Sequence, residues 1–71
     1  MKENENLQDK HVRLLRFPEV RRAVGLSRST IWRMALRGDF PRPIRIGKTA
    51  VAWPSSEVEK WIHDRVTASR K

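Results

Sequence analysis

Arginine side chains dominate the chemistry that this sequence offers, and they gather in its central part. Residues 11–48 carry ten Lys or Arg, nine of them Arg, against Glu19 and Asp39. The flanks differ, because residues 1–10 sum to −1 and residues 49–71 to +1 of a formal net charge of +8. A guanidinium presents a planar fork of donors that suits phosphate oxygens and guanine edges. We therefore expect a polyanionic partner, with nucleic acid favoured over an acidic membrane surface.

The segment LSRSTIWRMALRG, residues 26–38, predicts the short helix that would carry several of these cations. Ser27 is the expected N-cap, because its hydroxyl can accept a hydrogen bond from a backbone N–H of the first turn. Gly38 is the expected C′ residue. Helical spacing separates an apolar stripe from a polar face: Ile31, Met34 and Ala35 on one side, and Ser29, Arg33 and Arg37 on the other.

A second helical pattern precedes this segment, from Pro18 to Val24, and Gly25 ends it. Phe17 is disfavoured in helical φ/ψ because it precedes a proline, so the helix should begin at Pro18. Helical spacing predicts that Val20, Ala23 and Val24 face inward. Arg21 and Arg22 would then face outward. Two helices joined by a short turn containing glycine indicate a helix-turn-helix, with an ordinary αα-hairpin as the alternative.

After Gly38 the pattern changes from helical to alternating. Pro41 and Pro43 exclude a helix and favour an edge strand, and residues 50–53 would form the return strand. The loop between them has either two residues, Gly47 and Lys48, or four residues up to Ala50. Both alternatives place the same four side chains on one face of a two-stranded hairpin: Ile44, Ile46, Val51 and Trp53.

The two ends of the chain complete the expected domain. Residues 1–10 are polar and without periodicity and predict a disordered tail, so the folded domain would span residues 11–69. Pro54 ends the return strand, and Ser56 with Glu59 predicts a capping box for a last helix. The core stripe of that helix would be Val58, Trp61, Ile62 and Val66. We expect Trp53 and Trp61 to be buried, since a chain of 71 residues needs their apolar surface.

Helix, turn, helix, hairpin and helix is the order of a small winged helix-turn-helix, and here a family resemblance becomes specific. The block from Leu14 to Ile62, with LLRFPEVRRAVGLSRSTIWRMALRGDFPRPIRIG, VAW and SEVEKWI, resembles the AlpA family of phage regulatory proteins. The resemblance implies an α+β, mostly helical fold similar to MerR DNA-binding domains and excisionases, with three helices and a two-stranded β-hairpin wing. Three positions depart from the family's usual residues: Trp32 replaces a tyrosine, Thr49 an arginine and Ala52 a glycine.

The resemblance also implies a function. A member of this family would bind double-stranded DNA sequence-specifically in a prophage or genomic island and regulate transcription of an integrase gene. The alternatives are an excisionase that acts as a recombination directionality factor at an attachment site, and a protein-interaction module acting on an integrase or polymerase. RNA binding is less favoured, because an exposed aromatic platform for single strands is missing from the pattern. Further expected partners are copies of the same chain binding cooperatively on DNA, and an integrase.

In a winged helix-turn-helix the second helix enters the major groove and the wing reaches the backbone or minor groove. The candidate contacts in the second helix are Ser27, Arg28, Ser29, Thr30, Trp32, Arg33 and Arg37. The wing contributes Arg45, Lys48 and Thr49, and the first helix contributes Arg21 and Arg22 as backbone contacts. Each has a structural alternative. Arg28 could be ion-paired, Thr30 could complete the cap, and Trp32 could be a half-buried boundary residue.

The residues that catalysis or cofactor binding would need are not apparent. The chain has no cysteine, and His11 and His63 lack further ligands at metal-binding spacing. We find no nucleophile with a neighbouring base, no carboxylate pair for acid–base work and no glycine-rich phosphate loop. We therefore expect no enzyme activity, no metal and no cofactor. The apolar runs are too short for a bilayer or a secretory signal, which predicts a soluble cytoplasmic protein associated with the nucleoid.

Overall fold

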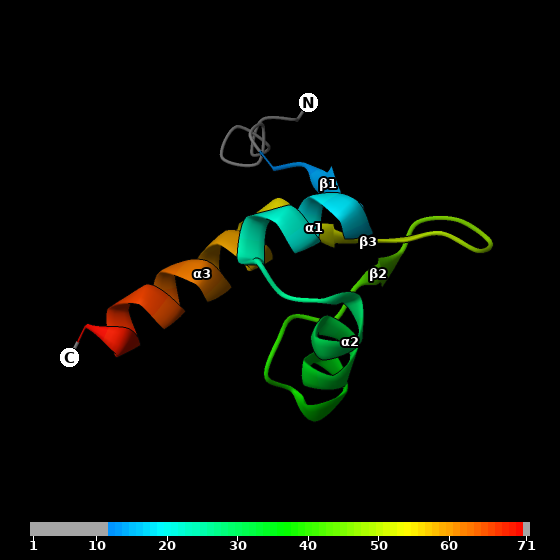
Figure 1. The fold of residues 1–71 in the computed structure, drawn as a ribbon. Helices are drawn as coiled ribbons and strands as arrows, with labels where there is room; N and C mark the ends of the chain where they lie inside the picture. The colour runs from blue at the N-terminus through cyan, green and yellow to red at the C-terminus, as the bar shows by residue number, and fades with distance from the viewer. Residues whose placement is uncertain (1–11, 71) are drawn as a thin grey trace.

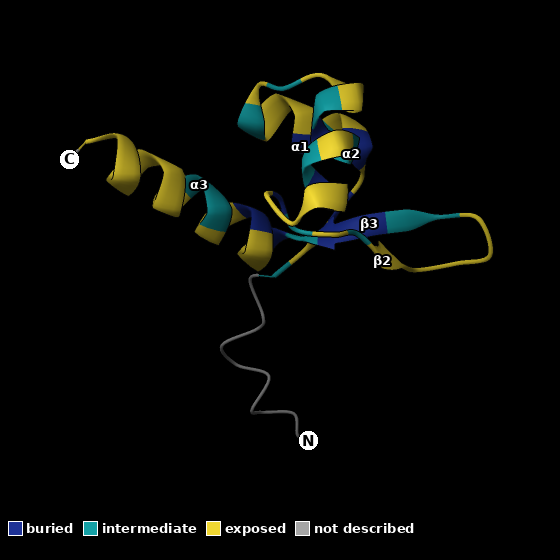
Figure 2. Cartoon of the chain, turned by 90° about the horizontal axis from the view of Figure 1, so that it is seen from below, coloured by how far each residue is buried: buried dark blue, intermediate teal, exposed yellow. Residues whose placement is uncertain are grey.

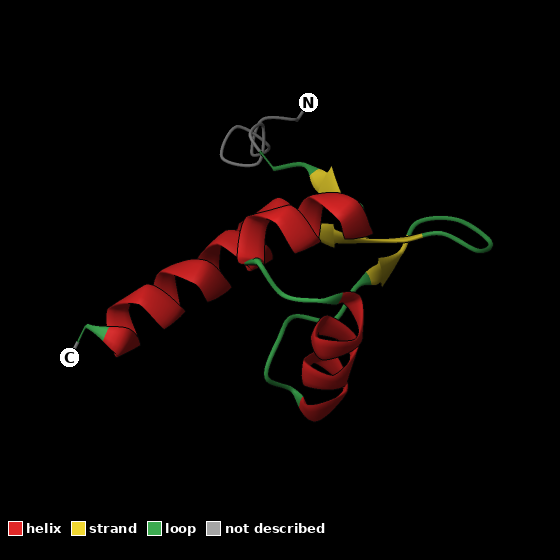
Figure 3. Cartoon of the chain, viewed as in Figure 1, coloured by secondary structure: helices red, strands yellow, loops and turns green. Residues whose placement is uncertain are grey.

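The computed structural model describes residues 12–70 of the chain, and the tail predicted for residues 1–10 lies outside this range. The elements are β1 (Leu14–Leu15), α1 (Phe17–Val24), α2 (Arg28–Arg37), β2 (Ile44–Arg45), β3 (Val51–Pro54) and α3 (Ser55–Ser69). Within the described residues the fold is α+β, mostly helical, with three helices and an antiparallel hairpin (Figures 1 and 3). The predicted fold class is confirmed.

The sheet has one more strand than the hairpin that the sequence predicts. Its order is β1-β3-β2, and both pairings are antiparallel. Leu15 lies opposite Trp53. Beyond β1, the Ser55 N–H donates to the Arg13 carbonyl over 2.7 Å, and the Arg13 N–H donates to Ser55 Oγ over 2.8 Å. The extended segment before α1 is thereby joined to the start of α3.

The hairpin register differs from both predicted alternatives. Ile44 pairs with Ala52 and Arg45 with Val51, and the Ile46 N–H donates to the Ala50 carbonyl over 2.9 Å. The loop is therefore residues 47–49, intermediate in length between the two predictions. A shift of one residue moves a strand's side chains to the opposite face. The prediction of one shared face was wrong, because Val51 and Trp53 lie opposite to the face of Ile44 and Ile46, which are 43% and 41% exposed.

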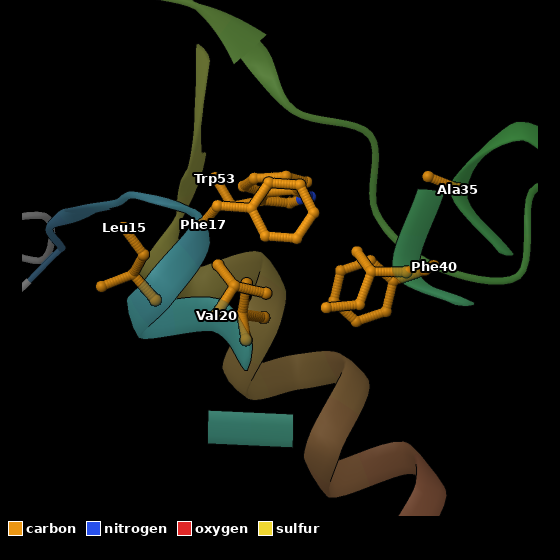
Figure 4. Close-up of a cluster of buried hydrophobic side chains, with 8 residues drawn as sticks. Leu15, Phe17, Val20, Ala35, Phe40 and Trp53 are labelled. Carbon is orange, nitrogen blue, oxygen red and sulfur yellow. The ribbon is translucent and has the colours of Figure 1, made fainter. Parts of the chain in front are cut away.

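The core lies between β3, α1 and α2, and its centre is Trp53. The Trp53 side chain is fully buried, and the Phe17 ring meets it edge-on at 5.1 Å between centroids (Figure 4). Val20, Ile31, Ala35, Ala52 and Val58 complete the most deeply buried set. The burial predicted for Trp53 is confirmed, whereas Trp61 is only half-buried and packs edge-on against Phe40 at 4.8 Å. A single small core has room for one fully enclosed indole.

Both outer helices differ from prediction at their ends. α1 begins at Phe17, one residue before the predicted start, because burial of the Phe17 ring overrides the local preference. Ala23 is exposed and was wrongly assigned to the core. α3 begins at Ser55 without a side-chain cap, so the capping box at Ser56 was wrong.

The far half of α3 runs past the body of the protein. Val66 was predicted to lie in the core stripe, but its side chain is 44% exposed. Figure 2 shows this end of α3 exposed on its visible side, in contrast to the buried start of the helix. The predicted stripe is therefore covered only from Val58 to Ile62.

Candidate nucleic-acid interface

Left-handed glycines and a serine cap set the length and direction of α2. Gly25 has φ 73° and closes α1, and only Leu26 and Ser27 then precede α2. Ser27 Oγ accepts from the Thr30 N–H over 3.3 Å. At the other end Gly38 has φ 84°, and its N–H donates to the Ala35 carbonyl over 3.2 Å. The predicted N-cap and C′ residue of α2 are both confirmed.

The two faces of α2 separate as predicted. Ile31 and Ala35 are 0% and 2% exposed, whereas Trp32 and Met34 are half-buried at the margins. The exposed side chains include four of the candidate contacts, namely Arg28, Ser29, Arg33 and Arg37. Ser29, Arg33 and Arg37 therefore lie on the side of α2 opposite the buried stripe, and Arg28 is exposed at the first residue of the helix.

The first two turns of α2 carry a small polar network. Ser27 Oγ donates to Thr30 Oγ1 over 2.9 Å, and Arg33 Nη2 donates to the same oxygen over 3.4 Å. Thr30 is half-buried at the centre of these contacts. It thus completes the cap and also restrains Arg33.

Arg28 is held in a different way. Its guanidinium carbon lies 4.6 Å from the centroid of the Phe17 ring, within the range of a cation–π contact. The same ring contacts Trp32 at 5.6 Å, and Trp32 contacts Trp53 at 5.9 Å. Trp32 is therefore half-buried at the margin of the core and packs against both rings.

The C-terminal end of α2 is stabilised by two arginines. Arg37 Nε forms an exposed ion pair with Asp39 Oδ2 at 3.3 Å. Arg42 donates from Nε to the Ala35 carbonyl and from Nη2 to the Leu36 carbonyl, over 3.3 and 3.4 Å. The sequence prediction did not include Arg42. The signal for it was a cation just past a helix end, where carbonyls are left unpaired.

The remaining candidates lie on other elements. Arg45, Lys48 and Thr49 are exposed and border a shallow hollow of about 130 Å³ in the hairpin, which extends away from the helices (Figure 1). Arg21 and Arg22 are exposed in the last turn of α1, at the opposite end of that helix from Phe17. The structure thus groups the candidates into three sets, one on α2, one in the hairpin and one on α1.

The described residues offer neither a cluster of metal ligands nor a membrane-spanning helix. Within residues 12–70, three or more His, Cys, Asp or Glu side chains never come together in a group that could hold a metal ion. A helix with the length and apolar character to cross a membrane is likewise missing from this range.

Helices α1 and α2 are joined by a tight turn, and α2 carries exposed basic side chains. An antiparallel hairpin and a third helix follow. This is the architecture of a winged helix-turn-helix. The sequence profile of the family described as "Prophage CP4-57 regulatory protein (AlpA)" matches residues 13–66. A protein of Enterobacteria phage P4, described as "Uncharacterized protein ORF88", is 42% identical over 59 residues, which cover 83% of this chain and 67% of the phage protein. The chain belongs to the AlpA family of phage regulatory proteins.

Proposed function

We propose that this protein is a non-enzymatic regulator that binds double-stranded DNA sequence-specifically and controls transcription of an integrase gene in a prophage or genomic island. It works in the cytoplasm, at the nucleoid. The exposed guanidinium groups of α2, on a helix whose Ile31 and Ala35 side chains are buried in the core, are the observation that supports this proposal most directly.

The start of α2 offers two kinds of donor to DNA. Arg28 is the first residue of α2. Ser27 caps the backbone N–H of Thr30, and the backbone N–H groups of Arg28 and Ser29 come before it in the first turn. Free N–H groups at a helix start suit phosphate oxygens. A bidentate arginine on guanine contributes about 1–3 kcal/mol of discrimination between bases. We assign base contacts to Arg28, Ser29 and Arg33 on this ground.

The other cations suit the DNA backbone. Arg45, Lys48 and Thr49 form a basic hairpin tip that would serve as the wing, and Arg21 and Arg22 extend the basic surface on α1. The exposed Arg37–Asp39 pair is weak in water and could exchange for a phosphate contact. A single module of this kind buries roughly 600–1,000 Å² and reads few bases. We therefore propose that several copies bind cooperatively to repeated sites.

Footprinting on the DNA that flanks the gene tests the proposal. Wild-type protein should protect a defined sequence at the integrase promoter. At the lowest wild-type concentration that gives protection, Arg28→Ala should leave the site unprotected, because its affinity falls by about fivefold or more. Arg70→Ala is the matched control, because it removes the same charge from the end of α3, far along the chain from α2. Protection that survives Arg28→Ala would contradict base readout by α2. Protection confined to the attachment site would replace the transcriptional role with recombination directionality.

A further inference from the structure

The contact between Arg28 and Phe17 joins the start of α2 to the start of α1. Phe17 is 9% exposed, and its ring is fixed by edge-on packing against Trp53 at 80° and by tilted packing against Trp32 at 52°. The guanidinium of Arg28 lies over the ring face that these contacts leave open. An exposed arginine is thus placed on a support that is itself part of the core.

We propose that Phe17 is a positioning residue for DNA readout, which holds the Arg28 guanidinium in the orientation that meets a base edge and so sets specificity without touching DNA. This inference rests on the proposed function of α2. A guanidinium stacked on an aromatic face keeps its N–H donors available at its edge. Because the Arg28 side chain is already held on the Phe17 ring in the free protein, it loses less conformational entropy when DNA binds.

The charge environment distinguishes Arg28 from its neighbours. The ion pairs among the described residues are Arg13 with Glu19, Arg37 with Asp39 and Lys60 with Asp64, so within this range no carboxylate pairs with Arg28. An aromatic face orients the cation without neutralising it. The full charge of Arg28 therefore remains available to a polyanion. Arg33, by comparison, donates a 3.4 Å hydrogen bond to Thr30.

A double-mutant cycle tests this role. The variants are Phe17→Leu, which keeps an apolar side chain and removes the ring, Arg28→Ala, and both together. The measured quantity is the ratio of affinities for the footprinted duplex and a scrambled duplex. Phe17→Leu should lower this ratio roughly threefold to tenfold, the range expected for a lost cation–π contact and added side-chain freedom. In the Arg28→Ala background it should leave the ratio unchanged.

Val58→Ala controls for a general loss of stability, because Val58 is 1% exposed and lies on α3, apart in sequence from both Phe17 and Arg28. It should lower Tm and leave the affinity ratio unchanged. An equal effect of Phe17→Leu in both backgrounds, or no effect in either, would overturn the inference. Wild-type protein that does not discriminate between the two duplexes would instead overturn the proposed function.

A measurement on the wild-type protein covers the case in which Phe17→Leu does not fold. A proton above an aromatic ring is shifted upfield by the ring current, so NMR reports whether the Arg28 side chain lies over Phe17. We expect the upfield shift of the Arg28 δ-methylene protons in the free protein and on the footprinted duplex. Loss of the shift when DNA binds would mean that Arg28 leaves the ring, and the inference would be wrong.

Discussion

At the scale of residues, three exposed cations of α2 are restrained to different degrees. Arg28 lies on the Phe17 ring, Arg33 donates to Thr30, and Arg37 pairs with Asp39. The cap by Ser27 could be predicted from sequence because it depends on residues within one turn. The support under Arg28 could not, since it joins two helices and depends on how they pack. Ala23 was wrongly predicted to be buried for the same reason. Helical spacing shows which side chains share a face, but it does not show whether another element packs over that face.

The Arg37–Asp39 pair gives a prediction at this scale. Asp39→Asn should raise affinity for native and scrambled duplexes alike, by up to about threefold, because it frees Arg37 and removes a negative charge near the DNA. The free energy of unfolding should change by less than about 1 kcal/mol, since the pair is exposed. Fluorescence anisotropy and thermal melts measure the two quantities. Reduced affinity would show that Asp39 holds Arg37 in its binding position.

At the scale of elements, the sequence predicted the helices and the two hairpin strands well. It predicted the pairing and register of the strands less well. The helices appear because apolar spacing and caps are local. The hairpin register was wrong by one residue because the loop has a length between the two that were weighed, and both of those share one facing pattern. The pairing of β1 with β3 was missed because a strand of two residues carries no periodic signal.

Ser55 and Ser56 test the observed start of α3 against the predicted capping box. Ser55→Ala removes the acceptor of the Arg13 N–H at a buried position, which should cost about 1–3 kcal/mol of unfolding free energy. Ser56→Ala changes an exposed side chain and should stay within about 0.5 kcal/mol. Urea denaturation compares the two variants directly. A larger loss for Ser56→Ala would favour the capping box and contradict the structure.

The hairpin tip gives a second prediction at the scale of elements. Lys48→Ala should weaken binding to native and scrambled duplexes by a similar factor and reduce the salt slope by about one, because a backbone contact carries little sequence information. Lys60→Ala is the matched control on α3, where Lys60 pairs with Asp64 at 3.0 Å, and it should change neither quantity. A selective loss on the native duplex would instead show that the wing reads bases.

At the scale of the whole molecule, a small core supports a positively charged surface. The composition already predicts that charge, because the formal net charge is +8. Seven of the ten basic central residues lie on α1, on α2 and in the hairpin, and the predicted class of partner follows from that charge alone. The fold class and the family were also predicted from the sequence, since the motif block from Leu14 to Ile62 covers most of the matched range of residues 13–66. The placement of Trp61 was not, because a half-buried and a buried indole have the same spacing along a helix.

The central claim is base readout by α2, and a salt titration tests it most directly. Binding to a duplex from the flanks of the gene is measured beside a scrambled duplex of equal length and composition. Affinity for both should fall as salt rises, because phosphate contacts release counterions. We predict tighter, cooperative binding to the native duplex, with an advantage that persists at high salt. Equal affinities that collapse together would show charge attraction alone and would contradict the account.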